Sequence, residues 1–505
     1  MSTAARTPVI IGVAQKTVRP EERPGPEPLD AWREVAIAAS ADAGLGPEIL
    51  KRLDFLAVAD CFTYAYDRPV DRLADELGAA PEIRFPSPAS GTAGQVMLDQ
   101  AMAAIREGRA ETALLVGGEA MATRRALTRD GGELGWRHPL PQGESPGVDL
   151  TEVQHPGEVA TGMMDGIGAV YTFAMRDIAR RAHLGITPEA YRQRLGGLMS
   201  GLTRVAAGNP DAWFPTERDP SFLIEPRPDN RYIAYPYTKH MVAIMDVDIS
   251  AAILLTSEAH ADELGVPADG RIYPWVMAYV NDPVFTAVRP DLWRSPGMHT
   301  AARAVLDAAG VTADDLGYID LYSCFPAALN FAADALGLEE PTGERLSLTG
   351  GLPYGGGPGS SYMLTSVGKM VRKLRADRDA VGLVSGVGMM MTNHAWGLYS
   401  ATRPPETLAP LDSTALQREL DAIPEVPVTE GYEGWVSVAT YTVMYNRRGE
   451  PTHGAAIADL PDGSRAYARI LDPVLLDEAL RTELVGRALW LKAGVGAGEL
   501  CRTQS

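Results

Sequence analysis

The sequence predicts an α/β protein built from two similar halves, with an inserted lobe and a small C-terminal β-barrel. Short apolar runs typical of buried strands alternate with longer segments of helical periodicity, which indicates a sheet with crossover helices. In the first 120 residues the strand-like runs are 9–13, 55–59 and 113–117, and the helical segments are 29–43 and 91–107. The second observation is an internal repeat, and the third is a change of pattern near the C-terminus.

The repeat consists of short patterns that recur at an offset of 266 residues. The matching pairs are Ala43-Gly44 with Ala309-Gly310, Leu53-Asp54 with Ile319-Asp320, and Met97-Leu98 with Met363-Leu364. A further pair, 113–121 and 381–389, follows with the offset two residues longer. Several matches in the same order indicate a duplicated α/β unit. The alternative is that features common to all doubly wound folds produce the matches.

The predicted boundaries follow from these patterns. The N-terminal half comprises residues 1–121 and 236–268, and the C-terminal half comprises 269–404. Residues 122–235 are rich in Pro, Gly, Trp and charge, with helical stretches at 169–182 and 188–206, and are predicted to form an inserted lobe. Such insertions commonly cover a ligand crevice at the strand ends of an open α/β sheet.

The C-terminal part has a different character. Residues 405–427 are rich in proline and are predicted to be a linker. Residues 435–445 then alternate between apolar and polar side chains, and further short strand patterns follow a turn at 446–449. We therefore predict a small β-barrel of OB type over 428–505.

Charge and composition exclude several classes of function. The chain holds 46 basic and 65 acidic side chains, a net charge of −19, so nucleic acid is not an expected partner. No apolar run is long enough for a membrane span, and the N-terminus lacks the features of a secretory signal, so a cytoplasmic location is expected. The three cysteines have no metal-ligand spacing, so no metal site is predicted.

Three sequence blocks resemble the thiolase superfamily. Residues 88–118 resemble its nucleophile block, which reads Cys-Ala-Ser-Gly before a long helix, an apolar strand and Gly-Gly. Residues 322–325, YSCF, resemble the oxyanion motif, which reads His-Asp-Cys-Phe in the sterol-carrier type. Residues 350–359, GGLPYGGGPG, resemble the Gly-His-Pro block. With its extra C-terminal region, the chain is most similar to the type 1 thiolase-like proteins. The resemblance implies the thiolase fold, with duplicated halves in five αβαβα layers.

The resemblance also identifies which catalytic positions differ. Pro88 stands where the family has its nucleophilic cysteine, and Gly357 stands where it has the activating histidine. Ser385 falls where most thiolases carry a second, acid/base cysteine. Ser90 is interpreted as a helix cap rather than a substitute nucleophile, because no histidine is nearby in sequence to activate it. A conventional thioester mechanism is therefore not expected.

The remaining candidates for catalysis are Tyr322, Cys324 and His394, and Cys324 matches the cysteine of the sterol-carrier motif. For each there is a structural alternative: a half-buried tyrosine, an inert small thiol and a structural histidine. The candidates for substrate binding are Ser90, Gly356, Gly359 and His240. The glycine-rich loop precedes a helix, so its N–H groups can hold an anion, although simple packing against the insertion explains it equally well.

Three functions are consistent with this pattern. The first is an acyl-CoA-handling protein of the acyltransferase class with a rebuilt site. The second is a thiolase-like aldolase that acts on a β-hydroxyacyl-CoA through Tyr322 and Cys324. The third is a protein that binds CoA or an acyl ligand without catalysis. No cofactor is expected, coenzyme A being part of the substrate or ligand. The sequence leaves open whether the chain is a monomer or a homo-oligomer.

Overall fold

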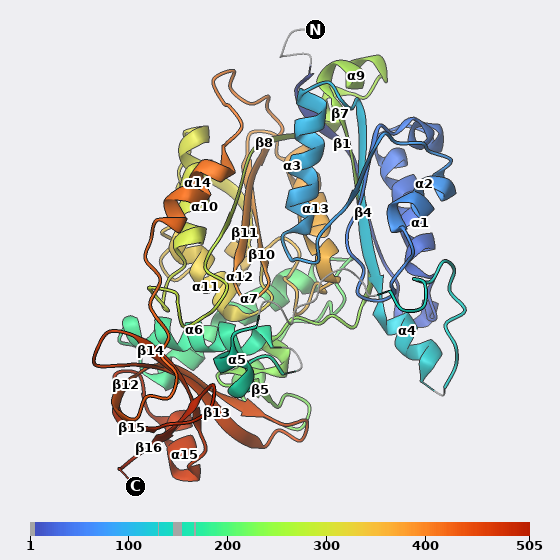
Figure 1. Ribbon diagram of the computed structural model, residues 1–505. Coiled ribbons are helices and arrows are strands. Elements are labelled where there is room, and N and C mark those ends of the chain that lie inside the picture. The colour runs from blue at the N-terminus through green and yellow to red at the C-terminus, as the bar shows by residue number, and fades with distance from the viewer. Residues whose placement is uncertain (1–5, 130, 145–153, 166–167, 505) are drawn as a thin grey trace.

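The computed structural model describes residues 6–129, 131–144, 154–165 and 168–504. Two β-sheets dominate it and confirm the predicted α/β architecture (Figure 1). The N-terminal sheet has the order β1-β7-β4-β2-β3 and the C-terminal sheet the order β8-β11-β10-β9. Their strands are β1 Pro8–Thr17, β2 Phe55–Val58, β3 Ile83–Pro86, β4 Thr112–Ala120, β7 Asp248–Ser257, β8 Tyr273–Asn281, β9 Leu316–Asp320, β10 Val381–Gly388 and β11 Asn393–Ser400.

Helices cover both sheets and fill the space between them, giving the five-layer arrangement of the thiolase fold. α3 and α13 lie between the sheets, α1 and α2 cover the N-terminal sheet, and α10 and α11 lie on the far side of the C-terminal sheet (Figure 1). Their bounds are α1 Pro28–Asp42, α2 Pro69–Leu77, α3 Ala93–Arg106, α9 Glu258–Glu263, α10 Pro296–Ala309, α11 Pro326–Ala335, α12 Gly343–Leu346 and α13 Tyr362–Ala376.

The central strands explain why the sheets pack so closely. Every residue of β4 is buried, because helices cover both of its faces. Gly117 in this strand permits the approach: a Cβ there would lie 2.6 Å from the Cβ of Ala59 and 2.8 Å from that of Ser361. β2 runs parallel to β3 and β4, so their carboxyl ends meet at one edge of the sheet. The loops that follow these strands are therefore brought together there.

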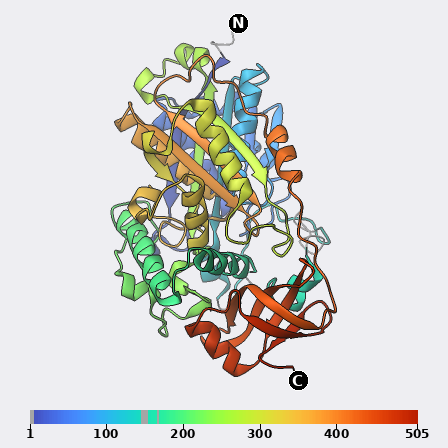
Figure 2. The same ribbon diagram turned by 90° about the vertical axis from the view of Figure 1, so that its left-hand side faces the viewer.

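The segment between the two halves forms a helical lobe below the sheets (Figure 2). Its elements are α4 Met121–Thr128, α5 Pro156–Ala160, α6 Ala169–His183, α7 Pro188–Ala207, α8 Pro220–Ile224, β5 Tyr232–Ala234 and β6 Tyr237–Thr238. α6 and α7 coincide closely with the two predicted helical stretches. Among the described residues, no helix combines the length and the apolarity that a bilayer crossing requires.

The C-terminal region forms the predicted closed barrel of five strands (Figure 2). Its elements are β12 Gly434–Tyr445, β13 Pro451–Asp459, β14 Arg465–Ile470, α15 Pro473–Arg481, β15 Ala488–Lys492 and β16 Gly498–Cys501. The barrel closes in the order β12-β13-β14-β16-β15-β12, with β14 and β16 parallel. β12 also pairs with β5, so the barrel sheet continues into the inserted lobe.

The segment predicted as a linker contains a helix, α14 Ser413–Asp421. Its Gln417 accepts a hydrogen bond from the N–H of Asn281 at 2.7 Å and donates one to the carbonyl of the same residue at 3.0 Å. Ser413 accepts a bond from the N–H of Tyr279 at 3.1 Å. The helix therefore covers the outer edge of β8, an interaction that the high proline content did not indicate.

Candidate functional site

The loop before α3 contains the residues that match the nucleophile block. Pro88 is exposed, whereas Ser90 is buried. The N–H of Ser90 donates to the hydroxyl of Ser360 at 3.1 Å, and its own hydroxyl accepts a bond from the N–H of Thr92 at 3.2 Å. The N-cap of α3 is Thr92, which makes no side-chain capping bond, so the predicted capping role of Ser90 is wrong. Ser90 instead closes the turn before the helix and joins this loop to the glycine-rich block.

Residues 322–325 lie between the end of β9 and the start of α11, directly against the nucleophile block. A Cβ on Gly91 would collide with the phenolic oxygen of Tyr322, so the ring packs onto the backbone of that loop. The N–H of Tyr322 donates to the hydroxyl of buried Ser385 at 3.2 Å. Cys324 is partly exposed, and its carbonyl accepts a bond from the N–H of Ala243 at 2.9 Å.

The end of β10 also packs against the nucleophile block. A Cβ on Gly388 would collide with the Ser90 hydroxyl, and the carbonyl of Val387 occupies the position of a Cβ on Gly91. The structure thus brings together Ser90 of the nucleophile block, Tyr322 of the oxyanion motif and Ser385 of β10. Cys324 belongs to the same turn as Tyr322.

The glycine-rich block packs tightly against its surroundings. The N–H of Gly357 donates to the carbonyl of Ile244 at 2.9 Å, and a Cβ on Gly357 would lie 3.1 Å from that oxygen. An imidazole at this position therefore requires neighbouring backbone to move. Gly356 and Gly359 have φ values of +106° and +49°, a backbone region that side chains other than glycine rarely adopt.

Burial keeps the two candidate acid/base groups protonated. It raises the pKa of the Tyr322 phenol well above its usual value, and Cys324 and Tyr362 add to the shift. Burial also raises the pKa of the Cys324 thiol. Both groups are therefore neutral near pH 7 and act as hydrogen-bond donors rather than as bases. Among the described residues, the Tyr322 hydroxyl has no hydrogen-bond partner, so it is free to donate to a ligand.

Sequence reasoning missed two residues behind this pair. The ring of Tyr362 lies edge-on to that of Tyr322, with centroids 5.4 Å apart, and its hydroxyl bonds to Thr349 at 2.8 Å. Asp320 accepts bonds from the N–H groups of Leu348 at 2.9 Å and Thr349 at 3.1 Å, and burial raises its pKa to about 6. Asp320 belongs to a repeated pattern and Tyr362 lies three residues after the glycine-rich block, so both signals were present in the sequence.

Glu119 is a further buried acid that the sequence did not identify. It is the next-to-last residue of β4, one before Ala120, and accepts bonds from the N–H groups of Phe62 at 2.9 Å and Thr63 at 2.8 Å, and from the Thr63 hydroxyl. The thiol of Cys61 lies 3.6 Å from the carboxyl group. A Cβ on Gly359 would lie 2.6 Å from Glu119, so this cluster adjoins the glycine-rich block.

Glu119 is expected to make stability depend on pH. Burial raises its pKa to about 7 from its ordinary value of 4.5, so the folded state holds the proton more tightly than the unfolded state. This contribution is fully present below about pH 4.5 and is lost as the pH rises through 7. From pH 5 to 8 the parent should lose on the order of 2 kcal/mol more stability than Glu119→Gln in urea denaturation. Identical pH profiles for the two proteins would contradict this.

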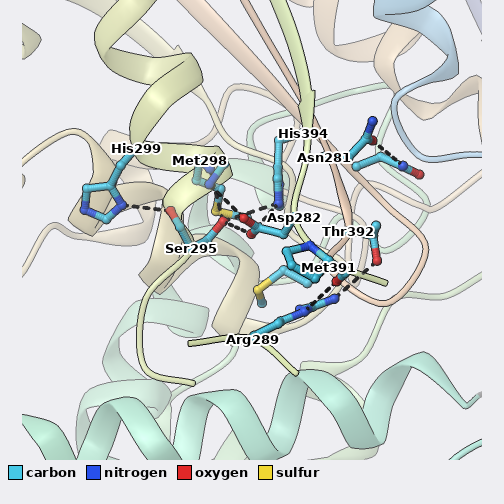
Figure 3. A network of polar contacts seen from close by, with 12 residues as sticks. Asn281, Asp282, Arg289, Ser295, Met298, His299, Met391, Thr392 and His394 are labelled. Atoms are coloured by element: carbon cyan, nitrogen blue, oxygen red, sulfur yellow. Dashed lines mark hydrogen bonds and ion pairs between the residues drawn. The ribbon is translucent and has the colours of Figure 1, made fainter. Parts of the chain in front are cut away.

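His394 lies in a different place from Tyr322. It is fully buried in β11, and its Nε2 donates to the carboxylate of Asp282 at 3.0 Å (Figure 3). The hydroxyl of Ser295 donates to the same carboxylate oxygen and lies 3.3 Å from the same Nε2. A catalytic triad requires the two ring nitrogens to have different partners. Because Ser295 and Asp282 share one nitrogen, this is a structural network at the start of α10.

Charge balance explains why the network stays buried. Burial alone would raise the pKa of Asp282, but the bond from His394 and the cations Arg176 and Arg289 hold it well below its usual value. Burial lowers the pKa of His394, which therefore stays neutral. Figure 3 shows Arg289 reaching Thr392, and a second bond goes to the carbonyl of Met390 at 2.8 Å.

Asp282→Ala is expected to destabilise the protein by about 3–5 kcal/mol, because it leaves two buried guanidinium groups without their carboxylate. Chemical denaturation measures the loss. Asp291→Ala is a suitable control, since it removes a surface ion pair with Arg294 and should cost less than about 1 kcal/mol. Equal losses in the two variants would contradict the charge-balance explanation.

His240 is also separate from the blocks around Tyr322. It is half-buried in the inserted lobe, where its N–H donates to Asn230 at 3.0 Å and its ring lies 5.2 Å from that of Phe222. Burial lowers its pKa, and the neighbouring Lys239 lowers it further. Among the described residues, no hydrogen bond or ring contact joins His240 to Tyr322 or Cys324, and no group of His, Cys, Asp and Glu side chains is suited to hold a metal ion.

Comparison with known proteins agrees with this architecture. The family model of the thiolase-like protein type 1 additional C-terminal domain matches residues 415–494. The crystal structure of a monomeric SCP2-thiolase like protein type 1 from Mycobacterium smegmatis superposes with a TM-score of 0.83 and 29% sequence identity, covering 99% of each chain. The structure of the Ltp2-ChsH2(DUF35) aldolase superposes with a TM-score of 0.61 over 79% of this chain and 99% of the other, but at 18% identity it shows the fold alone.

Similarity to curated sequences is more local. A 3-ketoacyl-CoA thiolase from Pseudoalteromonas translucida is 34% identical over 104 residues, which are 21% of this chain. The chain thus spans about a quarter of the length of that relative, 24%. The fold, the contact between the three blocks and the match to the additional domain agree with one another. The chain is a member of the thiolase superfamily, a type 1 thiolase-like protein with an additional C-terminal domain.

Proposed function

We propose that the protein handles acyl-CoA thioesters, in the manner of the acyltransferase class, without forming an acyl-enzyme. Two features support this. Pro88 carries no nucleophile at the position where the superfamily has its cysteine, and Gly357 carries no imidazole. His394 does not substitute for that imidazole, because its Nε2 is bound to Asp282 on the opposite face of the C-terminal sheet. Ping-pong transfer through a thioester therefore lacks both of its groups.

The observation that carries the proposal is the position of Tyr322. Its hydroxyl lies against Gly91 in the nucleophile block and, among the described residues, has no partner. Together with the protonated thiol of Cys324, it can donate hydrogen bonds to the carbonyl oxygen of a thioester. Such donors stabilise negative charge that develops on that oxygen, which is the charge an enolate carries.

A second candidate, an aldolase acting on a β-hydroxyacyl-CoA, rests on the same two groups. Retro-aldol cleavage breaks a carbon–carbon bond, turns the β-hydroxyl into a carbonyl and leaves the electron pair as an enolate of the remaining thioester. The β-hydroxyl releases its proton as the bond breaks, and the enolate takes up one proton to give the acyl-CoA, so no net proton is gained or lost. Tyr322 stands where the sterol-carrier motif has histidine, so a phenol replaces an imidazole at the position suited to this step.

The barrel and the inserted lobe complete the proposal. We assign residues 428–505 to a β-barrel of the OB type and residues 405–427 to the linker before it. We infer that the barrel holds the inserted lobe in place over the core. The hydroxyl of Thr442 donates to the carbonyl of Tyr235 at 2.8 Å, and Arg181 in α6 pairs with Glu483 at 2.8 Å. These bonds join the barrel to α6 and to the C-terminal end of the lobe. No cofactor is proposed, and coenzyme A enters only as part of the ligand.

Isothermal titration calorimetry with acetyl-CoA, acetoacetyl-CoA, a 3-hydroxyacyl-CoA and free CoA tests the proposal. We expect saturable binding of at least one ester at one site per chain, tighter than that of free CoA. Product analysis of the same mixtures distinguishes the candidates. Two carbonyl products from the hydroxy ester indicate an aldolase, and binding without products indicates a binding protein. Absence of binding by every ester would contradict the proposal.

A further inference from the structure

A cleft of about 640 Å³ opens at the outer edge of the C-terminal sheet, apart from the blocks around Tyr322. Its walls come from the end of α7, the edge strand β9, the short α12 and the outer part of α13. The volume falls within the usual range for small-molecule sites. Figure 1 shows α7, α12 and α13 near one another below and between the sheets.

The cleft concentrates positive charge in an acidic protein. Five cationic side chains line it, against the single carboxylate of Glu344, which gives a lining charge of 5 − 1 = +4. Asp211, which pairs with Arg372 at 3.2 Å, reduces this to +3. The five cations are Arg204, Arg345, Lys369, Arg372 and Lys373. The chain as a whole carries −19, so the cleft is a local exception that attracts anions.

Two of these cations are available to a ligand. Lys373 is exposed and, among the described residues, has no carboxylate within ion-pair distance; its ammonium lies 5.9 Å from the ring centroid of Tyr318. Arg372 is exposed and only partly neutralised by Asp211. By contrast, Arg204 is paired with Glu344, and Arg345 donates to the carbonyl of Leu316 at 2.7 Å.

Repulsion between the cations also favours an anion here. The ammonium of Lys369 lies deeper, where it donates to Asn209 at 2.7 Å. Burial lowers the pKa of Lys369, and although Asp211 opposes this, Arg372 and Lys373 lower it further. A bound anion would offset both the repulsion and the loss of hydration. The positive side chains around the cleft are therefore not fully neutralised by the carboxylates near them.

We propose that this cleft binds the phosphate groups of a nucleotide. Arg372 and Lys373 contact the phosphates, and the ring of Tyr318, which lines the same cleft, packs against the base. A single phosphate would leave most of the volume empty, which favours the larger ligand. The phosphates belong either to a free nucleotide or to the nucleotide end of coenzyme A. The site does not depend on the chemistry proposed at Tyr322.

The cleft is separated from the candidate active site by one loop. Ser347 and Leu348 line the cleft, and a few residues later the N–H of Leu352 donates to the buried hydroxyl of Ser323 at 3.1 Å. Ser323 lies between Tyr322 and Cys324 in the chain. A nucleotide in the cleft would therefore rest on the loop whose other end contacts the oxyanion motif.

Titration calorimetry of the full chain with ATP, 3′,5′-ADP and inorganic pyrophosphate at low ionic strength tests the site. We expect one nucleotide per chain, bound more tightly than pyrophosphate and more weakly as salt is added. Arg372→Gln/Lys373→Gln should raise the Kd at least tenfold. Stronger binding of 3′,5′-ADP than of ATP assigns the site to coenzyme A, and the reverse order assigns it to a free nucleotide.

The control is Lys51→Gln/Arg52→Gln, which makes the same change in net charge at exposed positions on the opposite half. Its Kd should equal that of the parent, and circular dichroism should show that both double variants are folded. The proposal is overturned if the parent binds none of the probes at millimolar concentration, if pyrophosphate binds as tightly as both nucleotides, or if the two double variants have equal affinity.

Discussion

Tyr322→Phe is expected to reduce turnover of any CoA ester that the parent consumes by about 10²–10⁴-fold, the range for a general acid/base group. The change removes only the phenolic oxygen, and the ring continues to pack against Tyr362 and Gly91. Ester binding should therefore stay within a few-fold of the parent. Steady-state rates together with calorimetric Kd values measure the two effects separately.

Turnover and ester binding of Cys324→Ala are compared with those of the parent in the same way. Tyr354→Phe provides a matched control for Tyr322→Phe. Tyr354 is also a buried tyrosine of the C-terminal half, but it belongs to the glycine-rich block and not to the oxyanion motif. Its variant should keep full turnover. If Tyr322→Phe and Tyr354→Phe behave alike, the phenol of Tyr322 has no special role in the chemistry.

Thiolysis of acetoacetyl-CoA with CoA is expected to stay at the background rate, and Pro88→Cys alone should not restore it. A thiol at position 88 would have no imidazole to activate it, and groups of this kind act as a unit. The double change Pro88→Cys/Gly357→His should also fail, because the new side chain would meet the carbonyl of Ile244, 3.1 Å from its Cβ. Release of acetyl-CoA, followed by chromatography, measures the rate.

Ser90→Ala separates a structural role from catalysis in the same assay. Because the Ser90 hydroxyl accepts the N–H of Thr92 in the turn before α3, the variant should lose about 1 kcal/mol of stability while keeping its activity. A thiolysis rate well above background in the parent that disappears in Ser90→Ala would instead make Ser90 a nucleophile.

Local sequence patterns were sufficient to predict most of the fold. The repeat predicted two equivalent halves, and both halves form sheets of the same kind around α3 and α13. Alternation over 435–445 predicted the first strand of the barrel, which is β12. The pairing of β12 with β5 was not predictable, because Met444 and Ala234 are more than 200 residues apart and only the folded chain brings them together.

Only part of the candidate site could be predicted, again because some of its contacts depend on how distant segments meet in the folded chain. Tyr322, Ser90 and Ser385 belong to motifs, so their meeting followed from the resemblance. The position of His394 depends on which face of the sheet each residue of β11 points to. Asn393 faces Ser90, and its Oδ1 lies 3.3 Å from the Ser90 hydroxyl. His394, the next residue, therefore points to the opposite face of the sheet. No pattern in the sequence determines where that alternation begins. The roles of the site residues stay predictions until the variants above are measured.

Intact-protein mass spectrometry after incubation with a CoA ester that calorimetry has shown to bind tests the central claim most directly. The proposed mechanism requires that the ester be held by hydrogen bonds from Tyr322 and Cys324, with no covalent acyl group on the chain at any time. We therefore predict the unmodified mass throughout, in rapidly quenched and in equilibrated samples alike. An added acyl mass that maps to a single residue, and that free CoA removes, would contradict the account.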